Sequence, residues 1–230
     1  MRKMKDENLA WQHVSTETII HDRWMDMRKS DYRLPDGKIA GPFYTFSRKD
    51  YAVIVATDTE GRYILVRQFR QGIRRVTDEF PAGGIELGGG CEYRMDFYSE
   101  NEIPAPADDK NLTGFSKTST AEPFFSKPEE NALAGAKREL LEETGYRSDE
   151  WEFLTKLPSA ATVADNWAYI FRAKNCVKVG AQDLDTIEFV NVRLAAPEEI
   201  ARMIAEGNFL QAMHVAAYYL AKEKDHGILC

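Results

Sequence analysis

The sequence predicts an α/β or α+β sandwich, and three observations support this fold class. Two apolar runs joined by a glycine-containing turn indicate a buried β-hairpin, one amphipathic stretch indicates a helix, and further strand-like runs precede two C-terminal helical stretches. A length of 230 residues suits one domain, or one domain with an appendage. We therefore expect a mixed sheet with helices packed against it.

The first 45 residues alternate apolar and polar side chains around the sequence LPDG. Pro35 presets φ and Gly37 supplies the positive φ that a hairpin reversal needs, so we expect antiparallel strands here. The runs YAVIVAT (51–57) and RYILVRQ (62–68) then predict two core strands, with Gly61 in the turn between them.

The segment EFPAGG at residues 79–84 cannot be helical, because Pro81 and two glycines interrupt it, and we expect a structured loop. Helical spacing returns from Ala132 to Leu141 and ends at Gly145, a residue that tolerates the left-handed conformation after a helix. Further elements are predicted as three strands, WEFLTKL, NWAYIFRA and IEFVNVRL, and two helices, residues 197–205 and 208–222.

Charge and composition exclude several classes of protein. With 30 Lys and Arg against 37 Asp and Glu, the net charge of −7 argues against a broad contact with nucleic acid or anionic lipid. No apolar run approaches the ~20 residues of a membrane helix, and the first residues lack the apolar stretch of a signal peptide. Three cysteines without a CxxC pair indicate neither a disulfide framework nor a zinc site. We expect a cytoplasmic protein without a nucleic-acid or membrane partner.

The sequence RELLEETG at residues 138–145 carries the most chemical information. On a helix, Glu139, Glu142 and Glu143 fall on one face, where like charges repel. A hard divalent cation compensates this repulsion well, and carboxylate-bound Mg²⁺ is typical of phosphate chemistry. The alternative is a solvated helix face with ion pairs to Arg138, which is the ordinary arrangement for such a pattern.

The segments EFPAGGIELG (79–88) and ENALAGAKRELLEETGY (130–146) together resemble the signature of the Nudix hydrolase family. That signature is Gly, five residues, Glu, seven residues, then Arg-Glu-apolar-x-Glu-Glu-x-Gly-apolar. Gly83 matches its first glycine and Glu130 its first glutamate. VRQFRQGIRR and LPDGK resemble the ADP-ribose and nucleotide-sugar diphosphatase branch. The resemblance implies a Nudix α/β/α sandwich with a mixed sheet.

The signature is split by 41 inserted residues, 89–129, which contain four prolines and six aromatics. Their place beside the glycine-rich loop favours a lid or a subunit contact, with a peripheral decoration as the alternative. The resemblance thus divides the chain into an N-terminal β region, residues 1–45, as a dimer contact, and a Nudix domain, residues 46–230, that carries the insertion.

The resemblance also implies a metal site. The backbone carbonyl of Ala82 and the carboxylates of Glu139 and Glu143 are expected to bind Mg²⁺, with Mn²⁺ as a substitute. Glu142 is expected to assist in metal binding or in catalysis by activating water, and Glu86 to lie near the metal.

Further roles follow from the same resemblance. Arg138 is expected to orient a catalytic glutamate through an ion pair. A further catalytic base or metal ligand is expected late in the sequence, on the loop before the strand IEFVNVRL. Glu188 is the leading candidate, and Asp183 and Asp185 on the same loop are its alternatives.

Two residues are candidates for substrate binding. Arg70 resembles the substrate-contacting arginine of the branch and could form a bidentate pair with a phosphate, although a structural ion pair at a strand end is an equal alternative. Glu79 is a second candidate, with a surface loop carboxylate as its alternative.

The implied activity is Mg²⁺-dependent hydrolysis of a nucleoside diphosphate sugar, of the ADP-ribose, ADP-glucose or GDP-mannose type, to a nucleoside monophosphate and a sugar phosphate. Members of this branch form homodimers by exchanging N-terminal strands, so a homodimer is implied. ADP-ribose-selective members often carry Ser-Pro-Gly after the signature, whereas this chain reads PSAAT at 158–162, which weakens that substrate. The alternatives are a nucleotide-binding or sensing module that no longer holds metal, and a diphosphatase for another nucleotide.

Overall fold

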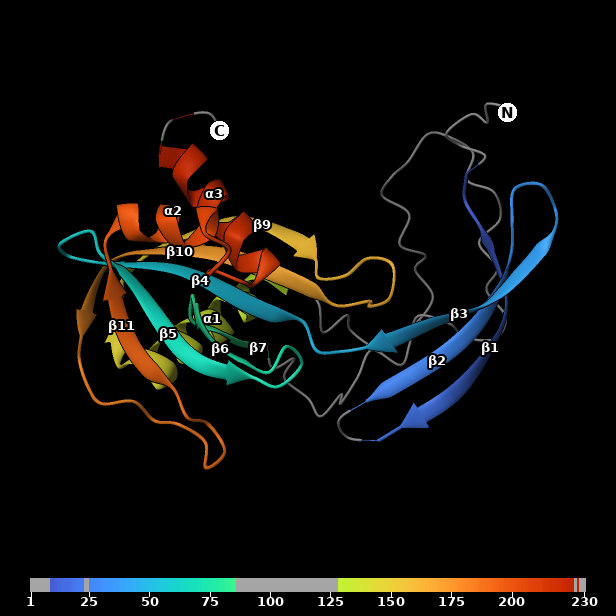
Figure 1. Cartoon of the computed structure of the whole chain (residues 1–230), viewed down its shortest axis with the longest axis horizontal. Coiled ribbons are helices and arrows are strands. Elements are labelled where there is room, and N and C mark those ends of the chain that lie inside the picture. The colour runs from blue at the N-terminus through green and yellow to red at the C-terminus, as the bar shows by residue number, and fades with distance from the viewer. Residues whose placement is uncertain (1–8, 23–24, 86–127, 226, 228–230) are drawn as a thin grey trace. The chain divides into compact units, whose positions relative to one another are not determined.

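The computed structural model describes residues 9–22, 25–85, 128–225 and 227, which form two compact units (Figure 1). The first unit contains the strands that precede Lys49 and the loop Ala160–Asp165. The second contains the other described residues. The segment 86–127, with Glu86 and most of the insertion, lies outside the described residues, so the predicted lid or contact role stays a prediction.

The N-terminal unit is a three-stranded antiparallel sheet in the order β1 (Gln12–His21), β2 (Asp26–Arg33), β3 (Ile39–Ser47). Gly37, in the turn between β2 and β3, has φ +88°, as the LPDG sequence predicts. The antiparallel strands expected in this region are therefore confirmed.

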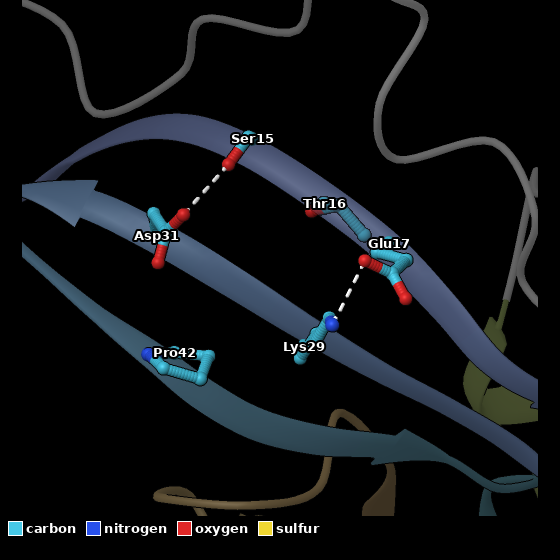
Figure 2. Close-up of a pocket in the computed structure, with 6 residues that line it drawn as sticks. All are labelled: Ser15, Thr16, Glu17, Lys29, Asp31 and Pro42. Carbon is cyan, nitrogen blue, oxygen red and sulfur yellow. Dashed lines mark hydrogen bonds and ion pairs between the residues drawn. The ribbon is translucent and has the colours of Figure 1, made fainter.

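A shallow hollow on this sheet is lined by polar side chains that satisfy one another (Figure 2). Ser15 Oγ donates to Asp31 Oδ2 at 3.0 Å, and Lys29 Nζ pairs with Glu17 Oε2 at 2.8 Å. Cross-strand pairs of this kind stabilise a sheet.

The second unit is built on an eight-stranded mixed sheet in the order β11-β5-β4-β10-β8, with β6, β7 and β9 paired to β5, β4 and β10. The central strands β4 and β10 run parallel, and every other pair in this sheet is antiparallel. The strands are β4 (Tyr51–Asp58), β5 (Tyr63–Arg70), β6 (Arg75–Glu79), β7 (Ala82–Gly84), β8 (Tyr146–Arg147), β9 (Glu150–Pro158), β10 (Trp167–Lys178) and β11 (Asn191–Ala195).

Helices cover both faces of the sheet (Figure 1). Val53 and Val55 of β4 pack with α2 (Pro197–Ala205) and α3 (Ala212–Asp225) on one face. Ala52 and Ile54 of the same strand pack with α1 (Pro128–Thr144) on the other. Because successive residues of a strand point to opposite faces, the unbroken apolar run of β4 belongs in the middle of three layers, and the predicted α/β/α sandwich is confirmed.

The last helix begins at Ala212 rather than at residue 208, and two further segments differ from the sequence prediction in type. Residues 82–84 of EFPAGG form the strand β7 rather than a loop, because backbone pairing with β4 needs no side chains and Ile54 N donates to Pro81 O at 2.9 Å. IEFVNVRL is a strand only from Asn191 onward. Its first half is loop, and Phe189 there is 86% exposed.

No helix in the described part of the chain is both long and apolar enough to cross a membrane.

Candidate functional site

The C-terminal end of α1 is fixed by its cap. Thr144 donates its hydroxyl to Leu140 O, and Gly145 has φ +72° while its N–H bonds Leu141 O at 2.7 Å. A Cβ atom at Gly145 would overlap the carbonyl of Gly180, so glycine is required for two independent reasons. The last turn of α1, which carries the glutamates, is therefore held in one place.

The apolar stripe of α1 determines where its carboxylates point. Ala132, Ala136 and Leu140 are fully buried against the sheet. Glu139 and Glu143 are turned toward the strand β7, and their side chains are largely buried, whereas the side chain of Glu142 is 36% exposed. The three glutamates thus lie along one edge of the helix, as the spacing predicts. Two of them, Glu139 and Glu143, are largely buried and do not belong to a solvated helix face.

Glu143 is bonded to the segment that precedes the helix in sequence. Ala82 N donates to Glu143 Oε2 at 3.0 Å, which brings together two of the residues predicted to hold metal. Burial raises the pKa of Glu143 to about 8, and the charges of Glu139 and Glu188 add to this shift against the opposing Ala82 hydrogen bond. Burial likewise raises the pKa of Glu139.

Arg138 lies between the carboxylates. Its Nη1 donates to Glu142 Oε2 at 2.6 Å, and its Nη2 donates to Glu139 Oε1 at 2.7 Å and to Gly84 O at 3.1 Å. One guanidinium therefore binds two glutamates and the end of β7, an arrangement that orients both side chains.

The loop between β10 and β11 is pinned to the end of α1. Gln182 donates its Nε2 to Glu143 O at 2.7 Å and to Val190 O at 3.0 Å, and Asp183 N donates to Glu142 O at 2.9 Å. Beyond this anchor the chain turns back, because Glu188 N donates to Asp185 O at 2.9 Å. The anchor brings the acidic loop, some 40 residues away in sequence, beside the helix.

These elements enclose a pocket of about 420 Å³. Its lining is strongly acidic and consists of Lys49, Gly84, Arg138, Glu139, Glu142, Glu143, Asp183, Leu184, Asp185 and Glu188. Five predicted site residues, the three glutamates of α1 with Arg138 and Glu188, thus line one pocket. The carboxylates of the described residues are not gathered around a single point as metal ligands, because Arg138 binds two of them.

Arg70 and Glu79 do not line this pocket; they bind each other. Arg70 donates Nε and Nη2 to Glu79 at 3.0 and 2.6 Å, Gln211 Nε2 donates at 3.2 Å, and Thr77 donates its hydroxyl. Glu79 is fully buried; although burial works to raise its pKa, the bonds from Arg70 and Thr77 hold the pKa below its usual value. The surface-carboxylate alternative for Glu79 is therefore wrong. Arg70 is still close enough to Glu143 for their charges to interact.

Two other predicted positions are not among the lining residues that the structure describes. Glu86 lies outside the described residues, so its expected place near the metal stays a prediction. Glu130, matched to the first glutamate of the signature, is exposed in the first turn of α1 and does not line the pocket.

The sequence did not reveal two residues of the site. Lys49, which lines the pocket, precedes β4 as a lone cation without a motif. Gln182, which anchors the loop beside the pocket, stands in a polar segment that carries no pattern either. The tertiary fold brings both residues to the glutamates, because it places the start of β4, the end of β7 and the 182–190 loop side by side.

Comparisons with known proteins agree with this architecture. The sequence pattern of the NUDIX domain matches residues 125–214. The chain is 26% identical over 199 residues to the ADP-ribose pyrophosphatase of Bacillus subtilis (strain 168), covering 86% of this chain and 85% of that protein. It is 25% identical over 205 residues to the methanol dehydrogenase activator of Bacillus methanolicus, covering 89% and 88%.

Among solved structures, one described as an ADP compounds hydrolase superposes with a TM-score of 0.68 at 18% identity, covering 95% of each chain. At this identity the likeness concerns the fold, and it extends over nearly the whole length of both chains.

Proposed function

Since the chain belongs to the Nudix hydrolase family, we propose that it hydrolyses the diphosphate bond of a nucleoside diphosphate sugar with the help of a divalent cation. The products are a nucleoside monophosphate and a sugar phosphate. One observation carries the proposal: the pocket joins three glutamates of α1 to the acidic loop that holds Glu188. The relative named as an ADP-ribose pyrophosphatase supports this substrate class.

The donor set of the pocket suits Mg²⁺, with Mn²⁺ as a substitute. Mg²⁺ takes oxygen ligands and is usually held by a few carboxylates together with substrate phosphates. Glu143 is nearly buried and has a strongly raised pKa, which means that its charged form lacks sufficient compensation in the pocket. We assign the metal to Glu139, Glu143 and the backbone carbonyl of Ala82, with Glu142 assisting. A bound divalent cation would supply a water molecule of lowered pKa and absorb charge on the phosphoryl oxygens.

The proton of the attacking water needs an acceptor in the pocket. Glu188 and Glu142 are the two carboxylates we assign to this role, because both line the pocket and neither is deeply buried. Asp183 and Asp185 remain alternatives to Glu188. Arg138 orients Glu142 and Glu139 through its two ion pairs.

Arg70 is assigned a contact with the substrate. Its Nε and Nη2 are engaged by Glu79, whereas Nη1 makes no hydrogen bond with a described residue and is left for a phosphate oxygen. Glu79 then serves to hold Arg70 rather than to bind substrate, and this replaces the role that the sequence suggested.

A homodimer is proposed for the N-terminal region, residues 1–45, as a domain distinct from the Nudix domain 46–230. All ten residues of β1 are exposed, and apolar side chains are prominent among the exposed residues of this sheet and of the segment just before it: Leu9, Trp11, Val14, Ile39 and Tyr44. Exposed apolar patches commonly mark protein contacts. Light scattering of the full chain gives its mass, and a monomer at micromolar concentration would refute this part of the proposal.

A substrate panel tests the activity. The purified chain is incubated with Mg²⁺ and ADP-ribose, ADP-glucose, GDP-mannose, dinucleoside polyphosphates and nucleotide coenzymes, and the released monophosphate is quantified. We expect a nucleotide sugar to be the best substrate, and we expect no turnover in EDTA. Inactivity on the whole panel together with tight nucleotide binding would favour the sensing module, which the engagement of two glutamates by Arg138 also permits.

A further inference from the structure

Lys49 is a cation at the rim of an acidic pocket. It precedes β4, its side chain is exposed, and it lines the same pocket as the glutamates of α1 and the loop residue Glu188. In the described part of the pocket lining, Arg138 is the other cation.

The backbone around Lys49 is held by three parts of the fold. Asn166 donates Nδ2 to Lys49 O at 3.2 Å. The next residue, Asp50, accepts Trp167 N at 2.8 Å through its side chain and Ile85 N at 2.9 Å through its carbonyl. These contacts tie the position to the start of β10 and to the residue after β7, so the root of the lysine is fixed while its flexible stem is free to follow a ligand.

The two pocket cations differ in what they already bind. Arg138 is engaged by Glu139, Glu142 and the carbonyl of Gly84. Lys49 forms no ion pair with any residue that the structure describes, although six carboxylates line the same pocket: Glu139, Glu142, Glu143, Asp183, Asp185 and Glu188. Its charge is thus available to an anion that enters the pocket.

A diphosphate is such an anion. A divalent cation held by the carboxylates would neutralise part of its charge, and the ammonium group of a lysine provides a mobile point charge for a remaining phosphate oxygen. An exposed lysine that served stability alone would contribute little at this position, since exposed ion pairs add only about 0–1 kcal/mol even when they form.

We propose that Lys49 is a substrate-binding residue that contacts a phosphate of the diphosphate at the mouth of the pocket. This inference rests on the proposed function. It assigns to the pocket a second phosphate contact, on an element separate from the strand that carries Arg70.

Equilibrium binding tests the proposal without turnover. The full chain and the variants Lys49→Met, Lys49→Arg and Lys137→Met are titrated calorimetrically with α,β-methylene ADP, a non-hydrolysable diphosphate, in the presence of Mg²⁺, and separately with Mg²⁺ alone. Lys137 is exposed on α1 next to Arg138 but does not line the pocket, so its loss changes the net charge equally.

We expect Lys49→Met to weaken binding of the analogue about tenfold, a loss in the range of one charge-assisted contact. Lys49→Arg and Lys137→Met should stay within about threefold of the original chain, and Mg²⁺ alone should bind Lys49→Met at least as tightly, because a repelling cation has been removed. A merely structural role would weaken both ligands.

The outcomes distinguish a failure of the role of Lys49 from a failure of the proposed hydrolysis. If the original chain hydrolyses the substrate panel but Lys49→Met binds the analogue equally well, or if Lys137→Met loses as much affinity, the role of Lys49 is wrong and the activity stands. If the original chain neither binds the analogue nor hydrolyses the panel, both the proposed function and the role of Lys49 are wrong.

Discussion

The backbone of Gly83 lies directly against the carboxyl group of Glu139. A Cβ atom at residue 83 would overlap that carboxyl group, so only glycine leaves Glu139 in its place. Gly83, the first glycine of the signature, and Glu139 are 56 positions apart in sequence. They are nevertheless in direct contact in the fold, in spite of the 41 residues inserted between them.

Gly83→Ala should displace the Glu139 carboxyl group and lower turnover at least tenfold, because a metal ligand moved by about 1 Å loses its geometry. The measurement is kcat against Mg²⁺ concentration. Gly72→Ala is the matched control, since no atom lies within 4 Å of its added Cβ. Unchanged kinetics for Gly83→Ala would mean that Glu139 does not act from this position.

Glu139→Gln and Glu143→Gln should each lower turnover at least a hundredfold, because each removes a ligand charge. Glu143→Gln should also stabilise the metal-free protein at pH 8. The pKa of Glu143 is raised to about 8, so between about pH 4.5 and 8 the folded state holds more protons than the unfolded state, and stability falls as pH rises.

Thermal unfolding in EDTA at pH 5 and pH 8 measures this second effect. The Tm of Glu143→Gln should exceed that of the original chain at pH 8, and the advantage should shrink at pH 5. Near-original turnover in both variants would refute the metal assignment, and an equal Tm difference at both pH values would refute the raised pKa.

Glu79→Gln should destabilise the fold and impair substrate binding. The change leaves Arg70 without its counter-charge; because Arg70 is one-third exposed and can be hydrated, we expect a loss of about 2 kcal/mol rather than the larger cost of a fully buried pair. Lys38→Gln, which breaks the exposed pair with Asp36, is the control and should leave the stability nearly unchanged, because solvent screens an exposed ion pair.

KM and kcat separate the two consequences of Glu79→Gln. Because Arg70 loses its orientation but not its charge, KM should rise several-fold while kcat changes less. A variant that loses stability yet keeps the original KM would show that the Arg70–Glu79 pair is structural alone.

His214 should make the protein sensitive to acid. It is buried, its Nδ1 accepts Phe80 N–H at 3.1 Å, and burial lowers its pKa to about 4. Between about pH 6.5 and 4 the unfolded state therefore binds more protons, and about 3 kcal/mol of stability is lost as pH falls through this window.

Denaturant unfolding at intervals from pH 7 to 4 measures the slope. His214→Gln should be less stable at pH 7 but should lose less stability across the window, whereas His13→Gln, on the exposed strand β1, should behave as the original chain. An unchanged slope in His214→Gln would contradict the assignment.

Much of the fold follows from local sequence. The apolar run of β4, the stripe of α1 and the stop at Gly145 each express a single local rule, and each was predicted at nearly its observed position. β7 was missed because its pairing depends on the backbone of β4 rather than on its own side chains. The prediction that the last strand begins at IEFV was wrong, because an alternating sequence forms a strand only where a partner strand lies beside it.

The site was predictable only in part. The positions of the glutamates on α1 follow from helical spacing. The burial that raises the pKa of Glu143 does not, because it depends on how the tertiary fold covers the end of the helix. The pairing of Arg70 with Glu79 and the arrival of Lys49 at the pocket both require the tertiary fold.

A crystal of the full chain soaked in Mn²⁺ tests the central claim most directly, because anomalous scattering identifies the ion and its ligands. Density coordinated by the carboxylates of Glu139 and Glu143 and by the carbonyl of Ala82 is the predicted result. If Mn²⁺ is absent there while Arg138 keeps its two ion pairs, the acidic pocket is not a metal site and the proposed hydrolysis has no catalyst.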